Sequence, residues 1–141
     1  MPTLATYILP LLSLAPWALA DEGWLDHCNS PKLFQSGYAK NSPANNVILN
    51  ANCQYAGGPN AIYHVGTDID LNQCFTNING VIQGQYGGKF GGSRKDLYLS
   101  GTIMHAQCLN YNHNYQDTSI DTYYYVGNNN GRMSCFGQEP V

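Results

Sequence analysis

Two Asn-rich strings in this sequence carry side chains that suit the recognition of hydroxyl groups. The string from Asn77 to Gly80 returns 51 residues later as the string from Asn128 to Gly131. A carboxamide donates and accepts hydrogen bonds at once, so it matches the vicinal hydroxyl pairs of a sugar. Asn-Gly is also a strong hairpin signal, because a type I′ turn needs positive φ at both central residues. The strings therefore predict tight turns, and a hydroxyl-binding role for the additional amides of Asn77, Asn128 and Asn129.

Patterns for catalysis and metal binding are weak by comparison. No Ser/His/Asp or Cys/His arrangement has a recognisable local signature, and the four His residues are scattered. Asp26 and His27 are the one candidate pair for acid and base catalysis. The five Cys contain no C-x-x-C spacing, which argues against a zinc or redox site. We therefore expect a protein that is not an enzyme and has no metal site and no cofactor.

Charge and composition exclude one class of partner and favour another. Six Lys or Arg stand against nine Asp or Glu, and the basic residues form no stripe, so nucleic acid is not an expected partner. Sixteen Asn and eleven Tyr give a surface that is polar but nearly uncharged. Such a surface suits neutral, hydroxyl-rich partners, which amides and aromatic rings recognise.

The first 20 residues and the cysteines indicate export. An apolar run over residues 8–19 ends in Ala18-Leu19-Ala20, a small-x-small pattern typical of a secretory signal that is cut before Asp21. A membrane anchor is the alternative, but Pro10 and Pro16 interrupt the run. All five Cys follow the signal, where disulfides persist, and their odd number leaves at least one thiol free or available to another chain. We expect a secreted, extracellular protein with no membrane insertion after cleavage.

Strand signals dominate residues 21–141. Between Val47 and Tyr55 apolar and polar residues alternate with the period of a half-buried strand, and Met104, Ala106 and Cys108 repeat its apolar face. Further short strands are expected at Val81-Ile82, Leu97 to Leu99 and Arg132-Met133. Residues 34–46 read as an insertion, and the glycines from Gly84 to Gly92 as a hinge or crossover between two copies.

The repeat extends to a pair of acidic residues. Ile69-Asp70 returns as Ile120-Asp121, again 51 residues later, so two structural units of about residues 23–86 and 87–137 are expected to form one domain over residues 21–141. Each Asp could cap one helical turn, although the strand propensity of the segment from Tyr123 to Val126 argues against a helix in the second copy.

Together these patterns resemble the cyanovirin-N homologue family of sugar-binding proteins. The resemblance is carried by Ile-Asp-Leu-Asn at Ile69 leading to Asn-x-Asn-Gly, by Leu/Met-x-Ala-x-Cys ending at Cys53 and Cys108, and by an aromatic residue four positions before Cys28. It implies an all-β, pseudo-symmetric tandem-repeat fold with strand exchange between the two repeats and short helical turns.

The resemblance also implies a disulfide framework. Cys28 and Cys53 would form the bridge within copy one, whereas in copy two Arg94 stands where the partner of Cys108 would be. The exchange of elements between repeats then makes Cys74 and Cys135 the expected second pair, although the sequence alone leaves the connectivity open.

Carried over by position, the resemblance implies one carbohydrate site in each half. The first site would combine Gly23, Asp26, His27, Gln54 and Ala56 with Asn128, Asn129 and Asn130. The second would combine Thr76, Asn77 and Asn79 with Gly91, Gly92, Ser93, Leu109, Asn110 and Tyr111. Because glycines replace polar groups at positions 91 and 92, we expect the second site to bind weakly or not at all.

The leading hypothesis is therefore a secreted lectin that binds mannose-type or related glycans without catalysis, as a monomer or a swapped dimer. The alternative is a secreted structural or interaction protein on the same scaffold that has lost sugar binding. The missing Cys and the Asp-Thr-Tyr-Tyr string at Asp121 in copy two motivate this alternative.

Overall fold

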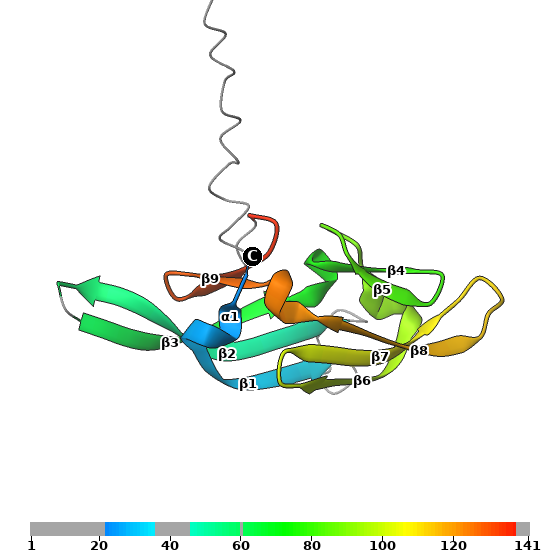
Figure 1. Cartoon of the computed structure of the whole chain (residues 1–141), viewed down its shortest axis with the longest axis horizontal. Helices are drawn as coiled ribbons and strands as arrows, with labels where there is room; N and C mark the ends of the chain where they lie inside the picture. Colours follow the sequence, from blue (N-terminus) through cyan, green and yellow to red (C-terminus); the bar gives the residue numbers. More distant parts are fainter. Residues whose placement is uncertain (1–21, 36–45, 60, 138–141) are drawn as a thin grey trace, which may run out of the picture.

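Short antiparallel strands build the protein in a computed structural model, which describes residues 22–35, 46–59 and 61–137 (Figure 1). Copy one comprises α1 (Trp24–His27), β1 (Cys28–Gln35), β2 (Val47–Gly58), β3 (Ala61–Asp70), the 3-10 turn η2 (Leu71–Gln73), β4 (Phe75–Ile78) and β5 (Val81–Gly84). Copy two comprises η3 (Phe90–Ser93), β6 (Arg94–Ser100), β7 (Ile103–Leu109), β8 (Tyr115–Asp121), η4 (Thr122–Tyr124), β9 (Gly127–Asn129) and β10 (Arg132–Ser134). The predicted signal segment, residues 1–20, lies outside the described residues.

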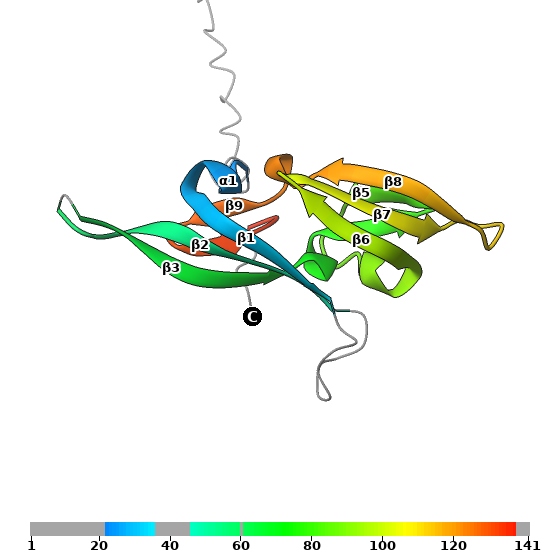
Figure 2. The same ribbon diagram turned by 90° about the horizontal axis from the view of Figure 1, so that it is seen from below.

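The two repeats exchange hairpins. Each repeat forms a three-stranded sheet, β1-β2-β3 or β6-β7-β8, and a separate hairpin, β4-β5 or β9-β10. Figure 2 shows the two larger sheets as separate lobes. The hairpin of copy two packs on the sheet of copy one, where Met133 N donates to Thr67 Oγ1 at 3.2 Å, and Ile82 N of copy one donates to Thr118 Oγ1 of copy two at 3.1 Å. The all-β, pseudo-symmetric fold with strand exchange is confirmed.

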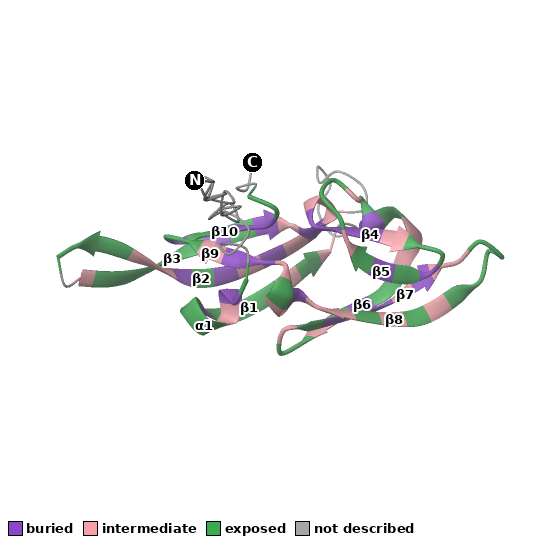
Figure 3. Ribbon diagram, turned by 45° about the horizontal axis from the view of Figure 1, so that its top comes forward, coloured by how far each residue is buried: buried purple, intermediate pink, exposed green. Residues whose placement is uncertain are grey.

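The core follows the predicted alternation along β2 and β7. Val47, Leu49, Ala51 and Cys53 are fully buried on β2, and β7 buries the alternating face of Met104, Ala106 and Cys108 (Figure 3). Tyr55, at the end of the β2 face, is only half-buried. Two disulfides cross this core, Cys28 to Cys53 and Cys74 to Cys135, and Cys108 is a buried free thiol. The expected pairing is therefore confirmed.

Both acidic caps start a helical turn. Asp70 Oδ1 accepts from Asn72 N, and Asp121 Oδ1 accepts from Tyr123 N, each at 3.0 Å. The propensity argument against the second turn is wrong, because Thr122 at its start is held by tertiary contacts. Its Oγ1 donates to Thr102 O at 2.6 Å and accepts from Trp24 Nε1 at 3.0 Å. Local preference yields to these buried bonds.

The connections differ from the prediction in one place. Phe34 and Gln35 belong to β1 rather than to an insertion, and residues 36–45 lie outside the described part. The glycine-rich segment after β5 forms a crossover, one of the two expected alternatives: Gly87 N donates to Gln73 O and Lys89 N donates to Asn72 O, both at 2.8 Å. These bonds fasten the crossover onto η2.

Candidate functional site

The first predicted site lies where the β9-β10 turn of copy two meets β2 of copy one. Asn128 Nδ2 donates to Gln54 O at 2.9 Å, and Ala56 N donates to Asn130 Oδ1 at 2.8 Å. Gly23 joins the group through a β-bridge to Gly127. The structure thus brings together five of the predicted residues from segments that are 70 or more positions apart in the sequence.

Asp26 and His27 lie beside this group, exposed on α1. Tyr123 Oη donates to Asp26 Oδ2 at 2.7 Å, and this hydrogen bond raises the pKa of Tyr123 above its ordinary value. The backbone carbonyl of Tyr123 also accepts from Gly23 N at 2.7 Å. Tyr123 is absent from the predicted site, because only the three-dimensional packing of η4 against α1 brings it there. The Asp26 carboxylate is therefore hydrogen-bonded to the phenol of Tyr123 rather than to the imidazole of His27.

Part of the amide chemistry of the first site is used within the turn. Asn128 Oδ1 accepts from Gly131 N at 2.8 Å, so both ends of this carboxamide hold the hairpin. Asn129 and Asn130 are exposed, and the Gln54 side chain is half-buried. The surface presented to a ligand is therefore formed by Asp26, His27, Gln54, Asn129 and Asn130.

The second predicted site repeats the same geometry in the other half. Asn77 Nδ2 donates to Leu109 O at 2.9 Å and to Ser93 Oγ at 2.8 Å, and Asn77 Oδ1 accepts from Gly80 N at 2.8 Å. Tyr111 N donates to Asn79 Oδ1 at 2.8 Å. These contacts bring Asn77, Asn79, Ser93, Leu109 and Tyr111 together, as the doubled turn predicts.

Few polar groups of the second site face outward. Asn110 Oδ1 accepts from Asn112 N and Asn114 N, each at 3.0 Å, and Asn110 Nδ2 donates to Gln116 Oε1 at 3.1 Å. Thr76 is buried, Gly91 is buried and Gly92 is exposed. The exposed side chains of Tyr111 and Asn79 are the main groups left for a ligand. The weakness expected of this site stays a prediction, with the commitment of these amides as its physical reason.

A half-buried arginine occupies the position of the missing cysteine. Arg94 is the β-sheet partner of Cys108, as Cys28 is of Cys53. Arg94 Nη1 donates to Gln35 Oε1 at 2.7 Å, whereas its buried Nε has no partner among the residues that the structure describes. Burial raises the pKa of the Cys108 thiol to about 11, and the nearby guanidinium only partly opposes this shift.

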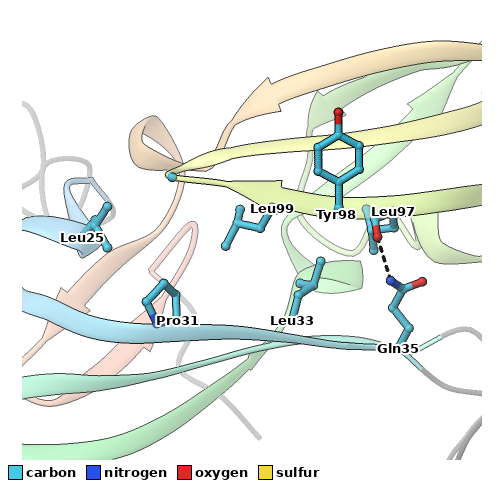
Figure 4. A pocket seen from close by; sticks show the side chains of 8 residues that line it. Leu25, Pro31, Leu33, Gln35, Leu97, Tyr98 and Leu99 are labelled. Carbon is cyan, nitrogen blue, oxygen red and sulfur yellow. Dashed lines mark hydrogen bonds between the residues drawn. The ribbon is translucent and has the colours of Figure 1, made fainter.

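Gln35 also closes one side of an apolar cleft between the two halves. Its Nε2 donates to Leu97 O at 2.9 Å, and the cleft, of about 320 Å³, is lined by Leu25, Leu33 and Leu99 (Figure 4). The bond joins β1 of copy one to β6 of copy two. We interpret this cleft as part of the contact between the lobes.

The described residues contain neither a metal-binding cluster nor a membrane-spanning helix. Among residues 22–35, 46–59 and 61–137, no three His, Cys, Asp or Glu side chains gather closely enough to hold a metal ion. No helix within these ranges has the length and apolar character needed to cross a membrane.

Comparison with known proteins identifies the fold. No family model and no curated protein matches the sequence. Among solved structures, a variant of MoCVNH3 in complex with (N-GlcNAc)4 is 16% identical with a TM-score of 0.65, over 81% of this chain and 97% of the other.

Two further solved structures agree. The Gibberella zeae cyanovirin-N homologue is 19% identical with a TM-score of 0.58, over 80% of this chain and 96% of its own. Microvirin, in complex with mannobiose, is 21% identical with a TM-score of 0.57, over 81% and 98%. With its exchanged hairpins and doubled Asn-x-Asn-Gly turns, the chain therefore has the cyanovirin-N homologue fold.

Proposed function

We propose that the chain is a secreted member of the cyanovirin-N homologue family and a lectin that binds mannose-type or related glycans without catalysis, chiefly through the first site. The observation that carries this proposal is that the β9-β10 turn bonds to β2 at Gln54 and Ala56. Asp26 and His27, exposed on the neighbouring α1, adjoin this contact. These groups supply donors and acceptors suited to sugar hydroxyls. The solved neighbours include one in complex with (N-GlcNAc)4 and one with mannobiose, which supports a glycan as the ligand.

A second candidate function is a secreted structural or interaction protein on this scaffold. The specific observation in its favour is that Asn77 and Asn128, the additional amides of the two strings, hold their own turns. Turn chemistry alone accounts for these two residues. The two functions differ in whether folded protein binds any glycan.

A glycan array followed by titration calorimetry tests the proposal. We expect Gln54→Ala to weaken the binding of the best array ligand roughly threefold to tenfold, the loss of about one hydrogen bond. The substitution leaves the Gln54 carbonyl, and hence its bond to Asn128, in place. Gln85→Ala, at an exposed glutamine that belongs to neither predicted site, serves as the control.

Three outcomes separate the alternatives. Folded protein that gives neither array signal nor heat favours the second function. Binding that is lost in Tyr111→Ala but unchanged in Gln54→Ala moves the activity to the second site. Loss in Asn128→Ala and Asn130→Ala that exceeds the loss in Asn77→Ala supports the first.

A further inference from the structure

The β2-β3 hairpin extends well beyond the body of the protein (Figure 1). It borders a groove. The groove, of about 540 Å³, lies between β3 at Val65 to Asp68 and the turn at Asn130 to Arg132, with Tyr55 among its walls. It shares Asn130 with the first site but otherwise lies apart from it, because the groove follows β3, the edge strand of its sheet, and the start of β10, whereas the first site lies along β2 and β9.

Aromatic and apolar side chains continue from this groove along the hairpin. The rings of Tyr55 and Tyr63 are 5.5 Å apart between centroids and inclined by 31°. Tyr63 is 51% exposed and Val65 is 42% exposed, so apolar surface faces water here (Figure 3). A Cβ atom added to Gly57 would come within 2.3 Å of the Tyr63 ring, so the ring lies directly on the bare backbone of Gly57. The backbone of Gly57 therefore supports the Tyr63 ring and fixes its position.

The second repeat shows that the fold does not need these aromatic residues. Where copy one pairs Cys53 with Val65, copy two pairs Cys108 with Gln116. Asn110, two residues after Cys108, takes the place of Tyr55, and its Nδ2 donates to Gln116 Oε1 at 3.1 Å. The Gln116 side chain also lies against Gly80, the counterpart of Gly131. The equivalent surface of copy two is thus polar and satisfied from within.

Copy one also lengthens this hairpin. Ile69 follows Cys53 by 16 residues, whereas Ile120 follows Cys108 by only 12. The additional residues lie between Tyr55 and Tyr63, where Ile62 is exposed. Asn114, 51 residues after Tyr63, takes the place of that tyrosine in copy two. The exposed Tyr63 ring lies beyond the two residues, Tyr55 and Val65, that pack against Gly131, and exposed apolar surface of this kind is a common feature of binding sites.

We propose that this groove is a further saccharide subsite, in which a pyranose ring stacks on Tyr63 and Tyr55 while its hydroxyls reach the polar rim. The rim supplies the Asp68 carboxylate, the Asn130 amide and the Arg132 guanidinium. Asn50 Nδ2 donates to Asp68 Oδ1 at 2.6 Å and holds that carboxylate in place. A pyranose combines an apolar C–H face with a polar edge, so it matches an aromatic wall beside charged and amide groups. The choice of a saccharide as the ligand of this groove rests on the proposed function.

Amide chemical shifts in the full chain, recorded during titration with the N-acetylglucosamine tetramer and with mannobiose, locate each binding event. We expect one of these sugars to shift Tyr63, Gly66 and Gly131. Tyr63→Ala should then weaken that event about tenfold, and Tyr63→Phe should retain it, because the ring does the stacking. Gly57→Ala displaces the ring without removing it and should also weaken binding. Tyr86→Ala, at a tyrosine of similar exposure, should change nothing.

The pattern of shifts separates the two proposals. Shifts confined to Asp26, His27 and Gln54 overturn the groove and leave the first site standing. Shifts confined to the groove overturn the first site. Folded protein without shifts at either place overturns both. Unchanged sugar affinity in folded Tyr63→Ala also overturns the groove as a saccharide subsite.

Discussion

At the scale of single residues, Arg94 shows how one position changes the chemistry of a repeat. In copy one the residue paired with Cys53 is Cys28, and the two form a disulfide. In copy two the pair is Arg94 and Cys108, so a guanidinium replaces a sulfur atom. Burial lowers the pKa of Arg94, and its buried Nε has no partner within residues 22–35, 46–59 and 61–137. An unsatisfied buried donor costs about 1 to 3 kcal/mol.

Arg94→Cys should therefore form a third disulfide, with Cys108. The bridge would close a segment 14 residues long and remove the buried donor, so we expect about 3 kcal/mol of added stability in the chain-entropy model. Mass spectrometry under non-reducing conditions would detect the bond, and denaturant unfolding would measure the gain. Arg94→Cys with Cys108→Ser is the matched control, since it removes the arginine without a bridge. Equal stability of the two variants would contradict the prediction.

At the scale of elements, the two Asn-x-Asn-Gly turns are the same device used twice. In each turn, the side chain of the first Asn accepts from the N–H of the final Gly and donates to a backbone carbonyl of the other repeat. The side chain of the second Asn of the motif, Asn79 or Asn130, accepts from the backbone N–H two residues after that carbonyl. Asn79 and Asn130 have φ of 50° and 47°, and their glycines 83° and 92°. The turn thus joins the repeats as well as reversing the chain.

Gly131→Ala tests how tightly the second turn is seated. A Cβ atom there would meet Tyr55 Cβ and Val65 Cγ1, both at 2.9 Å, in addition to the penalty of positive φ. We expect a loss of about 2 to 4 kcal/mol, from backbone strain and overpacking together. Gly101→Ala is the control, because its φ of +61° is similar but nothing lies within 4 Å. It should lose only about 1 to 2 kcal/mol. Similar losses of stability for the two variants in denaturant unfolding would show that contact with Tyr55 and Val65 adds no cost at Gly131.

The sequence predicts elements best where local chemistry decides them. Alternation in β2 and β7, the Asn-Gly turns and the acidic cap at Asp70 are all local signals, and the structure agrees with them. The turn after Asp121 depends on Thr102 and Trp24, which lie far away in the sequence. For the same reason, local signals do not predict the bond between Tyr123 and Asp26 or the hydrogen bond that the Asn77 side chain donates to the other repeat. The residues proposed for the two sites follow from the resemblance, which does not indicate which amides already hydrogen-bond within the turns.

At the scale of the whole molecule, each lobe is built from both repeats. Val126, Met133 and Cys135 of copy two are fully buried in the common core, and Trp24 of copy one donates to Thr122 of copy two. The disulfide from Cys74 to Cys135 also joins the repeats. Neither repeat therefore contains a complete core of its own.

A fragment of residues 21–86 should consequently be unfolded when isolated, although it holds a complete sheet and one disulfide. About 60 residues make a marginal domain even with an intact core, and this fragment lacks the hairpin that covers its sheet. We expect narrow amide dispersion in its proton NMR spectrum and no cooperative melting. Adding the fragment of residues 87–141 under oxidising conditions should restore dispersion and form the bond between Cys74 and Cys135. Cooperative melting of either fragment alone would show that the exchanged hairpins are dispensable, and would locate the stability within single repeats.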